Sequence, residues 1–342
     1  MIIDPLSALS TTVIVLIIIL ILFWPDKGIV WQLQSNHKNS QRVIQEDALK
    51  QIYDHEYRNK SATLRSVAGA LGFSMDKTSD ILDKLMRLGL VSFSDAHYTL
   101  TAQGRSYALR VIRLHRLWER YYADETGFPE KDWHKQAEKL EHSTTPSQAA
   151  ELAQSMGNPL FDPHGDPIPT IAGDIIKHDS LTLNSLKPGN AARITHIEDE
   201  PAVLYSQLVA SGLYPGMHIY ITEKGADRVR FVAEGEEIVL APVLANHINV
   251  QLIPEELAED DVSESLINLN LGESAEVTSI SKACRGIQRR RLMDLGIIPG
   301  TKISAELTTA SGNPTAYNIR GAMIALRHDQ AKMVKIRRTG SE

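Results

Sequence analysis

The second half of the chain contains an internal repeat, which limits the possible folds more than any other feature of the sequence. The stretches Leu186 to Gly189 and Leu208 to Gly216 recur 83 to 84 residues later, as Leu269 to Gly272 and Leu292 to Gly300. Each copy separates short alternating segments with Gly and Pro, a pattern typical of small β-domains. The first copy has three such segments, at 191–197, 217–222 and 229–233.

The repeat predicts two small SH3-like β-barrels of roughly 70 residues each. We place barrel 1 at 181–253 and barrel 2 at 266–338, with an acidic linker at 254–265. At 342 residues the chain also has room for one or two further domains before the repeat.

The first 24 residues have the composition of a membrane span. Leu6 to Trp24 contains no charged residue and has a Val/Ile/Leu centre, which is long enough to cross a hydrocarbon core of about 30 Å. A secretory signal peptide is the alternative, but no basic residue precedes the segment and no small-x-small cleavage site follows it. Lys27, Lys38 and Arg42 come after it. We therefore expect a transmembrane anchor at 1–24, a polar linker at 25–42, and the bulk of the chain in the cytoplasm.

Three helical patterns and a hairpin follow the linker. The helices are predicted at 43–58, 61–71 and 74–88, with Ser74 as an N-cap, and the hairpin strands at 91–93 and 98–100. This order is typical of a winged helix-turn-helix, which we place at 43–105. The fold class is therefore α+β.

Two predicted helices carry residues that bind divalent metals. His115 and Glu119 are four residues apart on a helix predicted at 101–123, while Glu138, Glu141 and His142 share one face of a helix at 131–142. Carboxylates and imidazoles without a thiolate favour Mn²⁺ or Fe²⁺, with Zn²⁺ as the usual competitor. The alternative is a solvated helix face, which Glu and Lys often form at these spacings.

Composition excludes several classes of function. The net charge of −6 argues against binding polyanions through bulk charge, and a single cysteine, Cys284, excludes a disulfide framework or a Cys-rich zinc site. The sequence has no Walker loop, no nucleophile elbow and no His-Glu-x-x-His. We therefore expect that the protein is not an enzyme.

Together these motifs resemble the iron- and manganese-dependent repressors of the diphtheria toxin repressor family. The resemblance rests on Leu114 to Arg120, on Glu138-x-x-Glu141-His142, and on Asp166-Pro167-Ile168-Pro169 at the end of a helical domain. Both barrels resemble FeoA domains, and barrel 2 does so more closely through Arg285 to Gly296. The resemblance implies a helical metal-binding and dimerisation domain at 106–170, a homodimer, and double-stranded DNA as a partner.

The resemblance also implies which residues bind metal. A first site would use Asp47, His115, Glu138, Glu141 and His142, and Glu119 and His134 match part of a second. Asp47 and Glu138 stand where iron sensors have Met and Cys, so the set is closer to that of manganese sensors. Lys50 stands where those sensors have an acid, and its charge argues against a second ion beside Asp47.

The predicted DNA-reading helix is acidic. Asp76, Asp80 and Asp83 lie among the expected DNA-contacting residues, which are Ser74, Lys77, Thr78, Ser79 and Lys84. The winged domain has eight basic and eight acidic residues between Val43 and Arg105, which is poor for neutralising phosphates. The alternative is therefore a cytoplasmic metal-sensing module of a metal transporter, with a winged helix that no longer binds DNA.

Three smaller features have simpler interpretations. Asp162, His164 and Asp166 are ligand-type residues, but the surrounding prolines favour a structural turn. The cluster of Arg285, Arg289, Arg290 and Arg291 could touch anionic headgroups, but we interpret it as the solvated face of a barrel helix. By the family resemblance, a carboxylate among Glu198, Asp199 and Glu200 would join the Glu119/His134 site.

Overall fold

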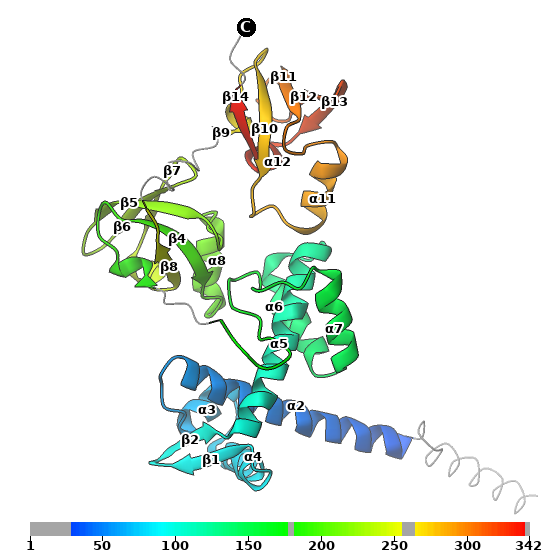
Figure 1. The fold of residues 1–342 in the computed structure, drawn as a ribbon, viewed down its shortest axis with the longest axis vertical. Coiled ribbons are helices and arrows are strands. Elements are labelled where there is room, and N and C mark those ends of the chain that lie inside the picture. The colour runs from blue at the N-terminus through cyan, green and yellow to red at the C-terminus, as the bar shows by residue number, and fades with distance from the viewer. Residues whose placement is uncertain (1–28, 177–180, 255–263, 339–342) are drawn as a thin grey trace, which may run out of the picture. The chain divides into compact units, whose positions relative to one another are not determined.

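A computed structural model describes residues 29–176, 181–254 and 264–338 (Figure 1). The chain divides into two compact units, one ending at Ile112 and the other beginning at Arg113. Within the described residues, no helix combines the length and the apolar character that a membrane span requires. The predicted anchor at Leu6 to Trp24 lies outside these residues.

The first unit has the elements of a winged helix-turn-helix. Three helices, a hairpin and the start of a long helix follow one another: α2 (Ile29–Tyr57), α3 (Leu64–Leu71), α4 (Met75–Arg87), β1 (Val91–Ser94), β2 (His97–Leu100) and α5 (Ala102–Glu125). The helix α2 begins well before residue 43, inside the segment predicted as a linker. That segment is polar, but it contains no Gly or Pro after Gly28 to interrupt a helix.

Local signals fix the turn between α3 and α4. Gly72 ends α3 in a left-handed conformation, with φ of 67°, and the Ser74 hydroxyl caps α4 by accepting a hydrogen bond from the Lys77 amide. Ile81, Leu82 and Leu85 form the buried stripe of α4. The Leu100 amide donates to Glu56 at 2.8 Å, which fixes the hairpin against α2.

The second unit begins with helices. After α5 come the 3₁₀ turn η1 (Glu130–Asp132), α6 (Trp133–Glu141) and α7 (Pro146–Ser155). Leu117, Ala153 and Ile168 form their core. The Pro-rich segment at 158–170 has no helix, as predicted, and Arg113 and Arg116 of α5 each donate to one of its carbonyls, those of Pro169 and Pro167, at 2.6 Å.

Two six-stranded antiparallel sheets follow, one in each repeat. The first repeat contains β3 (Leu181–Thr182), η2 (Leu183–Ser185), β4 (Ala191–Ile197), α8 (Ala202–Ala210), β5 (His218–Lys224), β6 (Val229–Ala233), β7 (Glu236–Leu240), α9 (Pro242–Ala245) and β8 (Ile248–Leu252). The second contains β9 (Glu264–Ser265), η3 (Leu266–Asn268), β10 (Ser274–Ile280), α11 (Gly286–Asp294), β11 (Lys302–Thr308), β12 (Thr315–Ile319), β13 (Ala322–Leu326), α12 (His328–Lys332) and β14 (Val334–Arg338).

The two sheets confirm the repeat. Their strand orders, β3-β8-β4-β5-β6-β7 and β9-β14-β10-β11-β12-β13 read from matching ends, are equivalent position by position. Each has a β-bulge at the same place, after Ile194 in β4 and after Val277 in β10. The end strands β3 and β7 are not hydrogen-bonded neighbours in the described sheet, so the predicted barrel is an open one. The short β3 has only two residues and pairs with β8 alone.

Candidate metal centre

The predicted pair on α5 is buried and in contact. His115 and Glu119 are 8% and 2% exposed, and His115 Nε2 lies 3.0 Å from Glu119 Oε1. One helical turn separates them, so the α5 backbone alone places both side chains on one face. A buried carboxylate is stable only when charged or hydrogen-bonding partners surround it.

The helix α6 supplies the partners. Glu141 is buried, hydrogen-bonds His115 Nδ1, and lies 3.1 Å from Nε2 of His142, the C-cap residue. Earlier on the same helix, Nδ1 of His134 lies 2.9 Å from Glu119 Oε1. Glu138 is more exposed, with its carboxylate 3.5 Å from His134 Nε2.

His115 contacts residues of both predicted metal sites. Its Nδ1 faces Glu141, while its Nε2 lies 3.1 Å from His134 Nδ1. The ligand atoms of His115, Glu119 and His134 all lie within 4.8 Å of one another. Oxygen and nitrogen ligands lie roughly 2.0–2.4 Å from a divalent ion, so one ion fits among them. Asp47 and Lys50 are half-buried on α2 of the first unit, and the metal role of Asp47 stays a prediction.

The cluster is strongly charged. Burial opposes ionisation of Glu119, but the imidazoles of His115 and His134 outweigh it and hold the pKa of Glu119 well below its usual value. Burial likewise opposes protonation of His134, but hydrogen bonds to Glu119 and Glu138 outweigh it and raise the pKa of His134 to about 10. In the metal-free protein His134 is therefore protonated at neutral pH, and this proton would compete with a metal ion for its nitrogen.

Stability of the metal-free protein should fall as pH rises from about 6.5 to about 10. The pKa of His134 is about 10 when folded and about 6.5 when unfolded. Below about pH 6.5 both states hold the proton and the stabilisation is complete; above it the unfolded state releases the proton first, so the free energy of unfolding declines. Urea unfolding at pH 6 and pH 9 measures this decline.

The matched variants are His134→Gln, which should flatten the decline, and His328→Gln, which changes an exposed histidine of barrel 2 and should preserve it. An equal decline in His134→Gln and in the unmodified protein would contradict the assignment.

Residues 162–166 form a turn, and they also carry ligand-type atoms. Asp162 Oδ1 accepts from the amides of His164 and Asp166, each at 2.9 Å. Arg116 lies 3.3 Å from Asp166 and 3.8 Å from Asp162. Burial, followed by the charge of Asp166, raises the pKa of Asp162 to about 7. Burial opposes ionisation of Asp166, but Arg116 and then His196 outweigh it and lower the pKa of Asp166.

Barrel 1 places one carboxylate near His134. Asp199 Oδ2 lies 3.7 Å from His134 Nδ1, whereas Glu200 is exposed. Sequence pattern alone left three acidic neighbours open, because strand and loop positions at the end of β4 cannot be told apart without the register.

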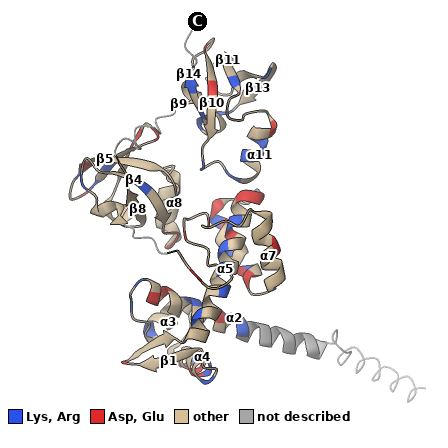
Figure 2. Cartoon of the chain, in the orientation of Figure 1, with Lys and Arg blue, Asp and Glu red and all other residues tan. Residues whose placement is uncertain are grey.

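The residues predicted to contact DNA lie on α4 or at its N-cap, and one of them cannot have this role. Lys77 and Lys84 are exposed and Ser79 is half-buried, while Ser74 serves as the N-cap. Thr78 is fully buried, and its hydroxyl donates to the Ser74 carbonyl at 2.9 Å. The prediction that Thr78 contacts DNA is therefore wrong: it lies three residues before Ile81, on the core face of the helix. Figure 2 shows both signs of charge on the winged domain.

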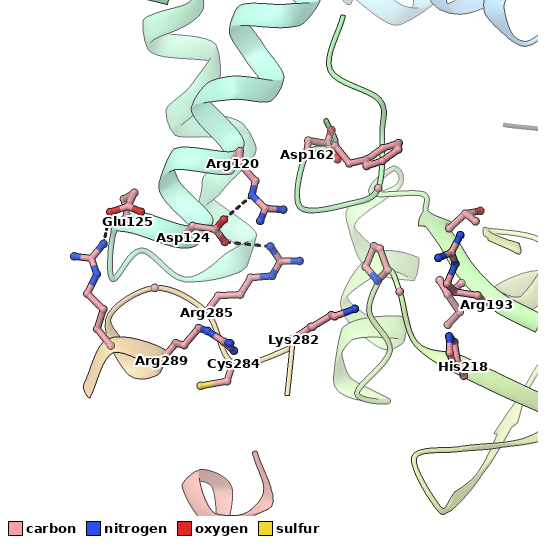
Figure 3. Close-up of a pocket in the computed structure, with 18 of the residues that line it drawn as sticks. Arg120, Asp124, Glu125, Asp162, Arg193, His218, Lys282, Cys284, Arg285 and Arg289 are labelled. Carbon is pink, nitrogen blue, oxygen red and sulfur yellow. Dashed lines mark hydrogen bonds and ion pairs between the residues drawn. The ribbon is translucent and has the colours of Figure 1, made fainter. Parts of the chain in front are cut away.

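A basic pocket of about 730 Å³ lies where α5, the turn and the two barrels meet (Figure 3). Arg285 of barrel 2 lies 3.2 Å from Asp124, which also pairs with Arg120 at 2.5 Å, and Arg290 pairs with Glu125. The interpretation of this cluster as a solvated helix face is therefore wrong for the half-buried Arg285, whereas Arg290 is exposed and its ion pair lies at the surface. Their partners come from the end of α5, more than 150 residues away in the sequence, so no local pattern indicates the pairing.

Comparisons with known proteins identify related domains in the chain. The domain family described as iron dependent repressor, metal binding and dimerisation domain, matches residues 101–170, and the FeoA domain matches 181–252 and 264–338. The iron-dependent repressor IdeR of Mycobacterium leprae (strain TN) is 26% identical over 220 residues, covering 60% of this chain and 95% of that protein.

Two further matches concern a repressor and a membrane protein. A solved structure described as a manganese-dependent transcriptional repressor in complex with manganese has a TM-score of 0.57 at 28% identity, covering 61% of this chain and 99% of that chain. A probable metal transport system membrane protein of Chlamydia trachomatis serovar D is 38% identical over 85 residues, which are 25% of this chain and 19% of that protein. The predicted resemblance to metal-dependent repressors and to FeoA domains is confirmed.

Proposed function

We propose, because the chain carries the metal-binding and dimerisation domain of the iron-dependent repressors followed by two FeoA domains, that it is a metal-dependent DNA-binding regulator of transcription that controls metal-ion homeostasis. The observation that supports this most directly is the cluster between α5 and α6, in which the buried His115, Glu119 and Glu141 meet the partly exposed His134. Its charges and donor types suit a divalent cation better than they suit a packed core.

The metal would be Mn²⁺ or Fe²⁺, with Zn²⁺ as a competitor. The donor set fits these ions, because it combines carboxylate oxygens and imidazole nitrogens without sulfur. In the proposal the ligands are Asp47, His115, Glu138, Glu141 and His142, with Glu119 and His134 as a second group. When bound, the ion supplies positive charge that neutralises the buried carboxylates.

The chain's own residues would convert binding into a switch. Asp47 belongs to the first unit, and the other proposed ligands belong to the second or to the part of α5 within it. A ligand that requires donors from both units favours the state in which the two are held together, by the difference of its affinities for the two states. In a homodimer this would fix the separation of the two α4 helices for double-stranded DNA.

Retention of DNA by the full chain, with and without Mn²⁺ across a salt series, tests the proposal. We expect tight retention only with metal. Replacing Lys77 and Lys84 together by Glu should weaken retention and reduce the slope of log affinity against log salt by about 1 for each phosphate that the chain no longer neutralises. The matched control changes Lys187 and Lys302, exposed lysines of the two barrels, to Glu, and should leave the slope unchanged.

A second candidate is a metal-sensing module attached to a metal transporter. Two observations favour it: the acidic residues Asp76, Asp80 and Asp83 on α4, and the similarity of part of the chain to a protein described as a metal transport system membrane protein. Metal binding without metal-dependent DNA retention would support this candidate and contradict the first.

We also propose that the protein is anchored in a membrane. The segment Leu6 to Trp24 would hold the chain at the membrane as one helix, with the bulk of it in the cytoplasm, because the apolar run is long enough to cross and basic residues follow it. We propose no catalytic activity, in keeping with relatives that are described as repressors.

A further inference from the structure

The basic pocket where α5, the turn at 162–166 and the two barrels meet has an excess of positive charge. Its volume of about 730 Å³ is within the range of about 300–1,000 Å³ that is usual for sites that bind small molecules. Three acidic residues line it, against six basic ones, which are Arg120, Arg193, Lys282, Arg285, Arg289 and Arg290. This excess favours an anionic ligand.

The carboxylate at the centre of the pocket is shared by two cations. Asp124 Oδ2 lies 2.5 Å from Arg120 Nε, and Asp124 Oδ1 lies 3.2 Å from Arg285 Nη1. Burial is the main cause that lowers the pKa of Arg120; Asp124 opposes it, and the charge of Arg285 adds to it. Two guanidinium groups therefore repel each other across one carboxylate, and a further anion beside them would reduce that repulsion.

Three other cations of the pocket have no carboxylate partner among the described residues. Arg193 donates to the side-chain amide of Gln251 at 2.9 Å, and Arg289 donates to two backbone carbonyls of its own barrel. Lys282 is exposed and lies against barrel 1, because a Cβ at Gly216 would be 3.5 Å from its Nζ. Figure 3 shows Lys282 pointing into the space between Arg285 and Arg193. These side chains are free to bind an anion.

We propose that this pocket binds a small anion with two or more linked phosphate groups, either an inorganic polyphosphate or the phosphate chain of a nucleotide. Guanidinium groups bind phosphate oxygens in pairs, and a lysine adds a point charge. The cations belong to α5, to β4 and to barrel 2 at and before α11. An orthophosphate ion fills only a small part of the pocket, whereas a phosphate chain reaches cations of all three.

The pocket also has apolar walls. Phe161, Pro215 and Met293 line it together with the charged residues. They offer a surface on which an aromatic or apolar part of the ligand can pack. The bound anion joins barrel 1 and barrel 2 to the end of α5, since each of the three contributes a cation.

Isothermal titration of the full chain with tripolyphosphate tests the proposal, in EDTA so that no divalent ion links the two. We expect tripolyphosphate to bind roughly 10-fold more tightly than orthophosphate, because more charged hydrogen bonds form. Lys282→Gln and Arg193→Gln should each weaken binding by roughly 10-fold, since each removes one charged donor. Both positions are exposed, so the variants should fold.

The matched controls are Arg291→Gln and Lys302→Gln. They remove the same charges from exposed positions of barrel 2 that do not line the pocket, and they should bind tripolyphosphate as the unmodified chain does. Equal affinity of the unmodified chain for tripolyphosphate and orthophosphate, or unchanged affinity in both pocket variants, would overturn the proposal.

A titration with ATP under the same conditions distinguishes the two sources of the phosphate chain. Tighter binding of ATP than of tripolyphosphate would support the site and identify a nucleotide, and equal binding would support the site and identify the phosphate chain alone. Because these titrations contain neither a free divalent ion nor DNA, their result does not depend on the proposed metal-dependent DNA binding.

Discussion

Replacing Glu119 by Gln should lower the affinity of the chain for Mn²⁺ by roughly 100-fold or more. Groups that only support metal ligands already contribute about 10- to 100-fold, and Glu119 lies among the proposed ligands themselves. Its carboxylate is 2% exposed and lies within 3.0 Å of both His115 and His134. An amide has the same shape but no charge, and it offers a single weak oxygen ligand.

Isothermal titration with Mn²⁺ gives the affinity, and nuclear magnetic resonance of the metal-free protein gives the pKa of His134. We expect the pKa of His134 to be lower in the variant, because the hydrogen bond to Glu119 is one of the interactions that raise it. The matched control is Glu151→Gln, the same change on an exposed position of α7, which should leave both quantities unchanged. An Mn²⁺ affinity within a few-fold of the unmodified protein would remove Glu119 from the ligand set.

Replacing Gly165 by Ala should separate the turn from barrel 1. Gly165 has a φ of +98°, and the new Cβ would lie 2.0 Å from the Thr195 carbonyl oxygen. The positive φ alone costs about 1–2 kcal/mol. The clash is with backbone of a paired strand, so the turn must move, and the hydrogen bond between His164 and Ile197 breaks with it. We expect a lower melting temperature and weaker metal binding.

Gly189→Ala separates strain from steric overlap. Gly189 lies in barrel 1 with φ of +86°, and a Cβ there would have nothing within 4 Å. The Gly189→Ala variant should lose stability through the positive φ alone, without a decrease in metal affinity. An equal decrease of stability in the two variants, with unchanged Mn²⁺ binding in Gly165→Ala, would show that the turn does not position the metal centre.

Patterns of short range predicted most elements correctly. The strands 191–197 and 229–233 are those of the structure, and Ser74 caps its helix as predicted, because caps, alternation and Gly/Pro punctuation act within a few residues. The start of α2 was predicted too late, because the polar residues before 43 were interpreted as a linker. A polar sequence does not stop a helix unless a residue that breaks the backbone is present.

The sequence by itself determined the repeat, the winged helix elements and the spacing of His115, Glu119 and Glu141, since each depends on periodicity along a single element. It did not determine that His115 faces both groups of ligands, or that Asp199 lies next to His134.

Only the tertiary structure decided these contacts. They join residues from α5, α6, the turn at 162–166 and the end of β4, and their positions depend on how closely the backbones pack. Gly165 against Thr195 is the example: one missing Cβ lets a turn approach a strand and brings a buried histidine to two carboxylates. No periodicity carries that information, because the distance is set by packing between elements far apart in the chain.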